Sequence, residues 1–60
     1  MTRLCDITVE EIHRTDKAIL VRDGDKEVWL PLSVCEINEK RNRIVEITLP
    51  EYYAQEKGLI

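Results

Sequence analysis

The sequence is poor in the residue types on which catalytic and metal sites depend. It has one histidine, His13, and two cysteines, Cys5 and Cys35, which are too far apart for a C-x-x-C zinc or redox motif. Ser33 and Cys35 are candidate nucleophiles, but neither lies in a nucleophile-elbow motif or next to a base. A chain this short also leaves little room for a substrate pocket. We therefore predict no catalytic residues, no metal site, no cofactor and no enzymatic activity.

The two cysteines leave two redox states open. Free cysteine is among the most buried residue types, which favours two reduced thiols with at least one of them in the core. A disulfide between Cys5 and Cys35 would close a loop of about 30 residues and add about 3–4 kcal/mol of stability. Nothing in the sequence indicates the secretory context in which disulfides form.

Long apolar runs and a basic excess are missing as well. No stretch approaches the ~20 apolar residues of a membrane-spanning helix, and no apolar segment of a signal peptide follows Met1-Thr2-Arg3. We therefore expect a cytoplasmic protein that does not act at a membrane. The net charge is −3, whereas nucleic-acid-binding domains usually carry a basic excess, because phosphate contacts dominate their affinity.

The composition of the chain is that of a folded protein, with 43% hydrophobic and 35% charged residues and the apolar residues in patterned runs. Its 60 residues predict a single small domain, residues 1–60. A domain of this size buries only about 60% of the surface that its unfolded chain exposes. Its core is expected to supply about 3–5 kcal/mol, so that a partner chain would add useful stability.

Two segments in the first half of the chain predict strands. Apolar and polar residues alternate from Arg3 to Ile12, which is the period of a half-buried strand, and the alternation slips at Glu10-Glu11. A β-bulge at that point would return Ile12 to the inner face. The continuous apolar run within Lys17–Arg22 predicts a central strand that is buried on both faces.

A tight hairpin turn is predicted at Asp23-Gly24, because glycine accepts a positive φ between two apolar runs. Asp23, Asp25 and Glu27 alternate around this glycine in a way that is similar to part of a calcium loop. The twelve-residue pattern of such a loop is incomplete, however. We therefore interpret these carboxylates as the solvated tip of a hairpin.

The strand predicted over Glu27–Val34 carries the only tryptophan. Val28 and Leu30 face one side of it and Trp29 faces the other, until Pro31 interrupts the ladder. Large aromatic side chains dominate small cores. We therefore expect Trp29 to cap the core beneath a C-terminal helix.

The second half of the chain predicts a charged hairpin loop over Asn38–Arg43, a strand over Ile44–Leu49 and a short helix. Pro50 suits the first helical turn, and Gly58 suits the left-handed position after the last one. Curling of such a short sheet would bury its inner face and remove most edges. We therefore predict a mainly β fold, a small SH3-like or partly open barrel of four to five antiparallel strands with a short C-terminal helix.

Three segments carry a resemblance to a known kind of domain: Asp16–Val21, Val28–Ser33, and Leu49–Ala54 with the ending Lys57–Ile60. Their pattern resembles a family of small β-rich domains encoded by phages and prophages in bacteria, whose members are of uncharacterised activity. The resemblance implies a bacterial host cell and is silent on activity. In that family the residue after the W-x-P step is often basic, whereas this chain has Leu32, so that a basic contact of the relatives would be lost.

Two functional hypotheses follow. In the preferred one, the chain is a phage or prophage accessory protein that acts by protein–protein interaction and modulates a host or defence complex. Exposed strand edges would supply the contact, with whichever of Tyr52 and Tyr53 faces outward, because tyrosine is enriched at interfaces. A homodimer is compatible with either hypothesis, since it would cover apolar surface that 60 residues leave exposed.

The alternative is a protein that binds single-stranded nucleic acid. Small barrels do so by pairing a basic groove with exposed aromatic side chains. The basic residues would come from Lys40, Arg41 and Arg43, and the stacking surface would come from Trp29 if its ring faces outward. The competing interpretation is a solvated charged loop, because Glu36, Glu39 and Glu46 lie beside these cations in the sequence.

Overall fold

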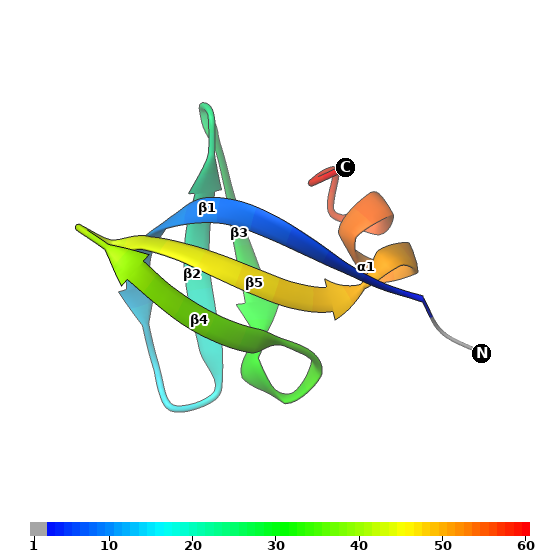
Figure 1. Cartoon of the computed structure of the whole chain (residues 1–60), viewed down its shortest axis with the longest axis horizontal. Helices are drawn as coiled ribbons and strands as arrows, with labels where there is room; N and C mark the ends of the chain where they lie inside the picture. The colour runs from blue at the N-terminus through cyan, green and yellow to red at the C-terminus, as the bar shows by residue number, and fades with distance from the viewer. Residues whose placement is uncertain (1–2) are drawn as a thin grey trace.

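Alternating apolar side chains fold the chain into five antiparallel strands, followed by one short helix (Figure 1). The structure is a computed structural model that describes residues 3–60. The predicted mainly β fold with five antiparallel strands and a C-terminal helix is confirmed. The elements are β1 (Leu4–Arg14), β2 (Ala18–Asp23), β3 (Lys26–Pro31), the 3-10 helix η1 (Leu32–Val34), β4 (Glu36–Arg41), β5 (Ile44–Pro50) and α1 (Glu51–Glu56).

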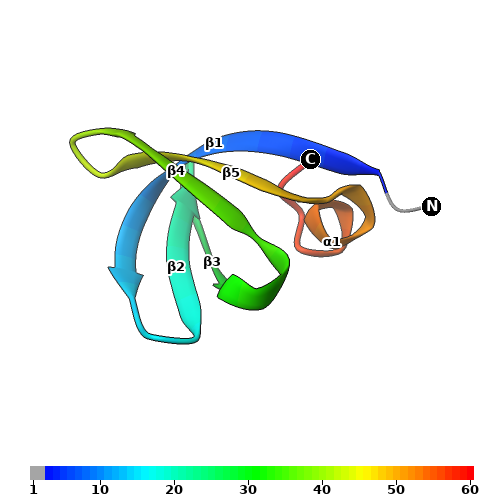
Figure 2. The same ribbon diagram turned by 60° about the horizontal axis from the view of Figure 1, so that its bottom comes forward.

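The longest strand, β1, organises the sheet, whose strand order is β3-β2-β1-β5-β4. Its first half pairs with β5 and its second half pairs with β2. Figure 2 shows that β2 and β3 run at a steep angle to β5, so that β1 bends from one half of the sheet into the other. The bend coincides with a β-bulge between Glu11 and His13, and bulges increase both bend and twist.

The bulge lies slightly later than the sequence indicates, and it acts on different residues. We expected a slip at Glu10-Glu11 that would return Ile12 to the inner face. Instead, Ile12 is itself the extra residue and is half-buried, while Glu11 pairs with Val21 on the inner face. Two polar side chains, those of Glu11 and Arg14, therefore continue the inner face of β1 beyond the bend.

The core lies on the inner face of the bent sheet and beneath α1. Its largest fully buried side chains come from β2, β3 and β5: Ile19, Leu30, Ile47, Leu49, Val21 and Val45. The position of β2 between β3 and β1 confirms that it is an internal strand. Its outer face is only partly covered, however, because Leu20 on that face is half-buried. The prediction of burial on both faces is therefore wrong.

An SH3-like or partly open barrel was expected, and the sheet does not close into a barrel. In the part of the chain that the structure describes, β3 and β4 lie at opposite edges and form no ladder with each other. Pro31 ends β3, and the single turn of η1 then redirects the chain so that β4 pairs with β5. The sheet is therefore open, and one ion pair, from Arg14 of β1 to Glu39 of β4 with 3.5 Å between nitrogen and oxygen, spans its open side.

The C-terminal helix ends as its sequence predicts. Gly58 has a φ of 75°, its N–H donates to the carbonyl of Gln55 at 3.1 Å, and the N–H of Leu59 donates to the carbonyl of Ala54 at 2.8 Å. These are the two hydrogen bonds of a Schellman motif. Leu59 is thereby turned into the core beside Ala54. No helix within residues 3–60 is long and apolar enough to cross a membrane.

The smallness of the core makes stability sensitive to single methyl groups. The Ile47 side chain is fully buried, so that Ile47→Ala should lower the free energy of unfolding by about 2–5 kcal/mol. That loss is comparable with the whole contribution of about 3–5 kcal/mol expected from a core of this size. The variant should be largely unfolded at room temperature, whereas Ile47→Val should lose only about 0.5–1.5 kcal/mol and remain folded.

Urea denaturation followed by far-UV circular dichroism measures both variants. An Ile47→Ala protein that unfolds at the same urea concentration as the wild type would show that Ile47 does not lie in the core.

Candidate functional site

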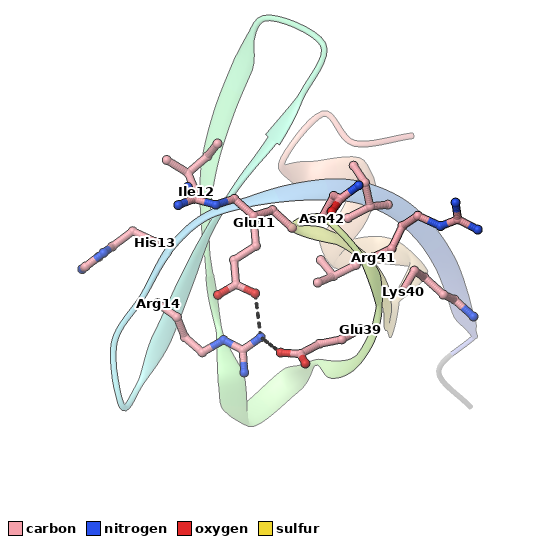
Figure 3. A pocket seen from close by; sticks show the side chains of 11 residues that line it. Glu11, Ile12, His13, Arg14, Glu39, Lys40, Arg41 and Asn42 are labelled. Atoms are coloured by element: carbon pink, nitrogen blue, oxygen red, sulfur yellow. Dashed lines mark hydrogen bonds and ion pairs between the residues drawn. The ribbon is translucent and has the colours of Figure 1, made fainter.

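A hollow of about 580 Å³ opens between the bent end of β1 and the β4–β5 hairpin (Figure 3). It is lined by residues 11–14 of β1 and residues 39–45 of the hairpin. Four of the nine lysines and arginines of the chain line it, but only two of the twelve acidic residues do so. The hollow therefore concentrates positive charge in a chain whose net charge is −3.

Ion pairs neutralise part of this charge. One guanidinium nitrogen of Arg14 lies 2.8 Å from a carboxylate oxygen of Glu11 and 3.5 Å from one of Glu39, and Figure 3 shows the three side chains pointing toward one another. Lys40 lies 3.9 Å from a carboxylate oxygen of Glu46, which is a loose contact. Arg41 and Arg43 form no ion pair with any residue of the range 3–60. The uncompensated charge of the hollow therefore belongs to the tip of the hairpin.

The tip itself is a two-residue turn with an unusual residue in it. Asn42 has a φ of 48° and Arg43 a φ of 68°, as in the type I′ turn that favours Asn-Gly. Asparagine tolerates this left-handed conformation, whereas for a side chain such as arginine it costs about 1–2 kcal/mol. Strained backbone of this kind gathers at functional sites. The turn therefore has an arginine at a position where glycine would give a more stable fold.

The turn is held in place by β1. The backbone N–H of Glu11 donates to the carbonyl of Arg43 at 2.7 Å, immediately before the bulge at Ile12. The prediction of a charged loop over 38–43 is wrong for residues 38–41, which belong to β4, and only Asn42 and Arg43 form the turn. The predicted cations Lys40, Arg41 and Arg43 thus line the hollow, and the facing segment of β1 was not anticipated from the sequence.

Trp29 lies on the outer face of the sheet and is 47% exposed. It pairs with Leu20 of β2, which in turn pairs with His13 of β1, so that the three residues form one row across the outer face. The rings of His13 and Trp29 approach edge to face, with 6.2 Å between centroids and an interplanar angle of 87°. The expectation that Trp29 caps the core is wrong, because Val28 and Leu30 occupy the inner positions of β3 and α1 packs against β1 and β5.

The two tyrosines lie elsewhere. Tyr52 is 58% exposed on α1, and Tyr53 is half-buried against the core with the ammonium of Lys57 at 5.5 Å from its ring centroid. Figure 1 shows α1 at the end of the sheet opposite the β4–β5 turn. The six binding residues predicted from sequence therefore divide into three groups: Lys40, Arg41 and Arg43 line the hollow, Trp29 lies on the outer face, and Tyr52 and Tyr53 lie on α1. Arg14 and His13 complete the group around the hollow, and only the bend of β1 reveals them.

Both thiols are free, and both are half-buried against the core, so that neither lies fully inside it as was expected for at least one of them. Burial raises the pKa of Cys35 and, together with the carboxylates of Glu51 and Asp6, that of Cys5. A protonated thiol is a poor nucleophile. Among residues 3–60 no cluster of three or more His, Cys, Asp or Glu side chains is placed to hold a metal ion.

No family model, curated protein or solved structure matches this chain. Three features of the fold bear directly on function. These are the uncompensated arginines of the hairpin tip, the strained turn that carries one of them, and the exposed tryptophan on the outer face.

The strain of the turn is measurable. Arg43→Gly should raise the free energy of unfolding by about 1 kcal/mol, because glycine adopts a positive φ without steric cost, although it also gives the unfolded chain more freedom. Asn42→Gly is the matched control and should change stability less, since asparagine already tolerates this conformation. Urea denaturation compares the two. If Arg43→Gly instead lowers the free energy of unfolding, the arginine side chain stabilises the fold, and the positive φ at this position is not a net cost.

The buried thiol should leave a signature at high pH. Because the pKa of Cys35 is raised in the folded state above its ordinary 9.0, the unfolded chain releases the thiol proton first as the pH rises. The stability that this group contributes is present below pH ~9 and falls above it. The difference in unfolding free energy between the wild type and Cys35→Ala should therefore shrink from about pH 8 to about pH 10. A difference that is constant over this range would contradict burial of the thiol.

Proposed function

We propose that this chain is a non-catalytic binding domain that holds the phosphate backbone of a nucleic acid at the tip of its β4–β5 hairpin. The observation that carries the proposal is the pair Arg41 and Arg43, which have no carboxylate partner within residues 3–60 of an acidic chain. Lys40, whose only ion pair is the loose one to Glu46, adds a third cation to the same tip.

The chemistry of the tip suits phosphate. A guanidinium presents its donors in a planar fork that matches a phosphate group, and its charge is permanent. The hollow beside the tip gives a ligand a concave surface, and Arg14 lies within it, paired to Glu11 and Glu39. Because the whole chain is acidic, long-range repulsion opposes a polyanion. Binding should therefore be weak, local and strongly dependent on salt.

A protein partner is the second candidate, and a different surface favours it. Leu4 is 65% exposed and Tyr52 58% exposed at the end of the sheet near α1, where Leu4 pairs with Pro50. Exposed apolar side chains and free strand edges are typical of protein interfaces. A phage accessory protein or a homodimer would use this end and would leave the hairpin tip free.

The nucleic-acid proposal predicts a specific dependence on salt. A fluorescein-labelled oligothymidylate, followed by anisotropy, should bind with a Kd of about 10–100 μM at low salt. If three cations contact phosphates, the logarithm of the association constant should fall with the logarithm of salt concentration with a slope of about −2. Arg41→Gln should weaken binding and make this slope shallower by about 0.7, which is the share of one phosphate contact on a single strand.

The matched control is Arg3→Gln, which removes the same charge next to α1, where the carbonyl of Arg3 accepts a hydrogen bond from the N–H of Glu51. Affinity and slope should be unchanged in this variant. Absence of binding at low salt, or equal effects of Arg3→Gln and Arg41→Gln, would refute the proposal and would leave the protein partner as the function to pursue.

A further inference from the structure

The outer face of the sheet carries an aromatic row that begins next to the basic turn. We define the aromatic row as His13, Leu20 and Trp29, which are paired across β1, β2 and β3. Its β1 end adjoins the turn, because the N–H of Glu11, two residues before His13, donates to the carbonyl of Arg43. From β5 to Trp29 on β3 there are three strand spacings, or about 14 Å. The β1 end of the row therefore lies beside the turn that carries Arg43, and Trp29 lies at its far end.

The row presents its tryptophan in a fixed position. Half-buried Leu20 lies between His13 and Trp29 in the ladder, and the edge-to-face contact with His13 supports the ring of Trp29 at a centroid distance of 6.2 Å. The ring is 47% exposed although it is the largest apolar group of the chain. Proteins that bind single-stranded nucleic acids combine cations with exposed aromatic rings on which the bases stack.

A second row on the same face limits what else can bind. Glu10, Arg22 and Glu27 are paired across the same three strands, and Arg22 is already held by Glu27 at 2.8 Å and by Glu10 at 3.8 Å. On β2 this row passes through Arg22, two residues from Leu20 of the aromatic row. It contains two glutamates and one arginine and therefore carries a net negative charge. It would repel the second backbone of a duplex that lay across the face.

The geometry points to a single-stranded ligand whose phosphates lie at Arg41 and Arg43 and one of whose bases stacks on Trp29 beside His13. This inference rests on the proposed function. It adds that the ligand is single-stranded and that Trp29 contacts one of its bases. About four nucleotides, the lower end of the range for small β folds, are expected to occupy the site.

The single tryptophan makes the inference directly testable. Titration with oligothymidylate should quench the fluorescence of Trp29, whereas the same sequence in a duplex should leave it unchanged even where charge alone brings the duplex to the protein. Trp29→Ala should weaken oligothymidylate binding about tenfold, as expected for the loss of one stacked base, and should leave the salt slope unchanged. Arg41→Gln should change that slope. The two variants thus separate stacking from charge.

Controls keep these outcomes distinct. Tyr52→Ala removes an exposed aromatic ring from α1 and should not alter binding, and Trp29→Phe should retain part of the affinity because it keeps a stacking face. Circular dichroism shows whether each variant is folded. The Trp29 variants are expected to fold, because the ring of Trp29 lies outside the core.

Three results would overturn the inference in different ways. If no oligonucleotide binds at low salt, the proposed function fails, and the inference fails with it. If oligothymidylate binds but neither quenches Trp29 nor responds to Trp29→Ala, phosphate binding stands and base stacking is refuted. If a glutamate–tyrosine copolymer binds more tightly than oligothymidylate and quenches Trp29, the surface recognises an acidic, aromatic protein segment.

Discussion

The bend of β1 is the constraint on which the rest of the structure depends. A flat sheet of five strands would leave its apolar face exposed, because α1, with six residues, is the one α-helix that residues 3–60 provide to cover it. By bending at Ile12, β1 belongs to both halves of the sheet, and the two halves bury their inner faces against each other. A chain of 60 residues thereby obtains a core with the help of very little helix.

The same bend produces the candidate site. Beyond the bulge, Glu11 and Arg14 take inner positions that apolar residues hold elsewhere, and they face the β4–β5 hairpin across the open side of the sheet. An apolar pair there would complete the core, but the charged pair leaves a hollow that is spanned by the ion pairs of Arg14 with Glu11 and Glu39. Arg43 likewise occupies a turn position that favours glycine. At both places the chain gives up stability in a domain that has little of it, and both places border the hollow.

Much of the fold follows from local pattern. Alternation located β1 and β5, Asp23-Gly24 located the first hairpin, and Gly58 located the end of α1, because each depends on the backbone preferences of neighbouring residues. Barrel closure was predicted wrongly, since it depends on where β4 goes after Pro31. The position of Trp29 was also wrong, although the alternation of β3 already placed it opposite Val28 and Leu30.

The sequence by itself determined β1, β2, β3, β5, the helix and the identity of the basic residues, because these follow from periodicity, turn chemistry and composition. The tertiary structure alone decided that the sheet stays open, that Arg14 and His13 join Lys40, Arg41 and Arg43 around one hollow, and that Trp29 lies on the outer face of the sheet while Tyr52 and Tyr53 lie on α1. Those relations depend on the direction in which one bulge bends one strand. A bend of that kind sums small dihedral changes over several residues, and no short stretch of sequence specifies the result.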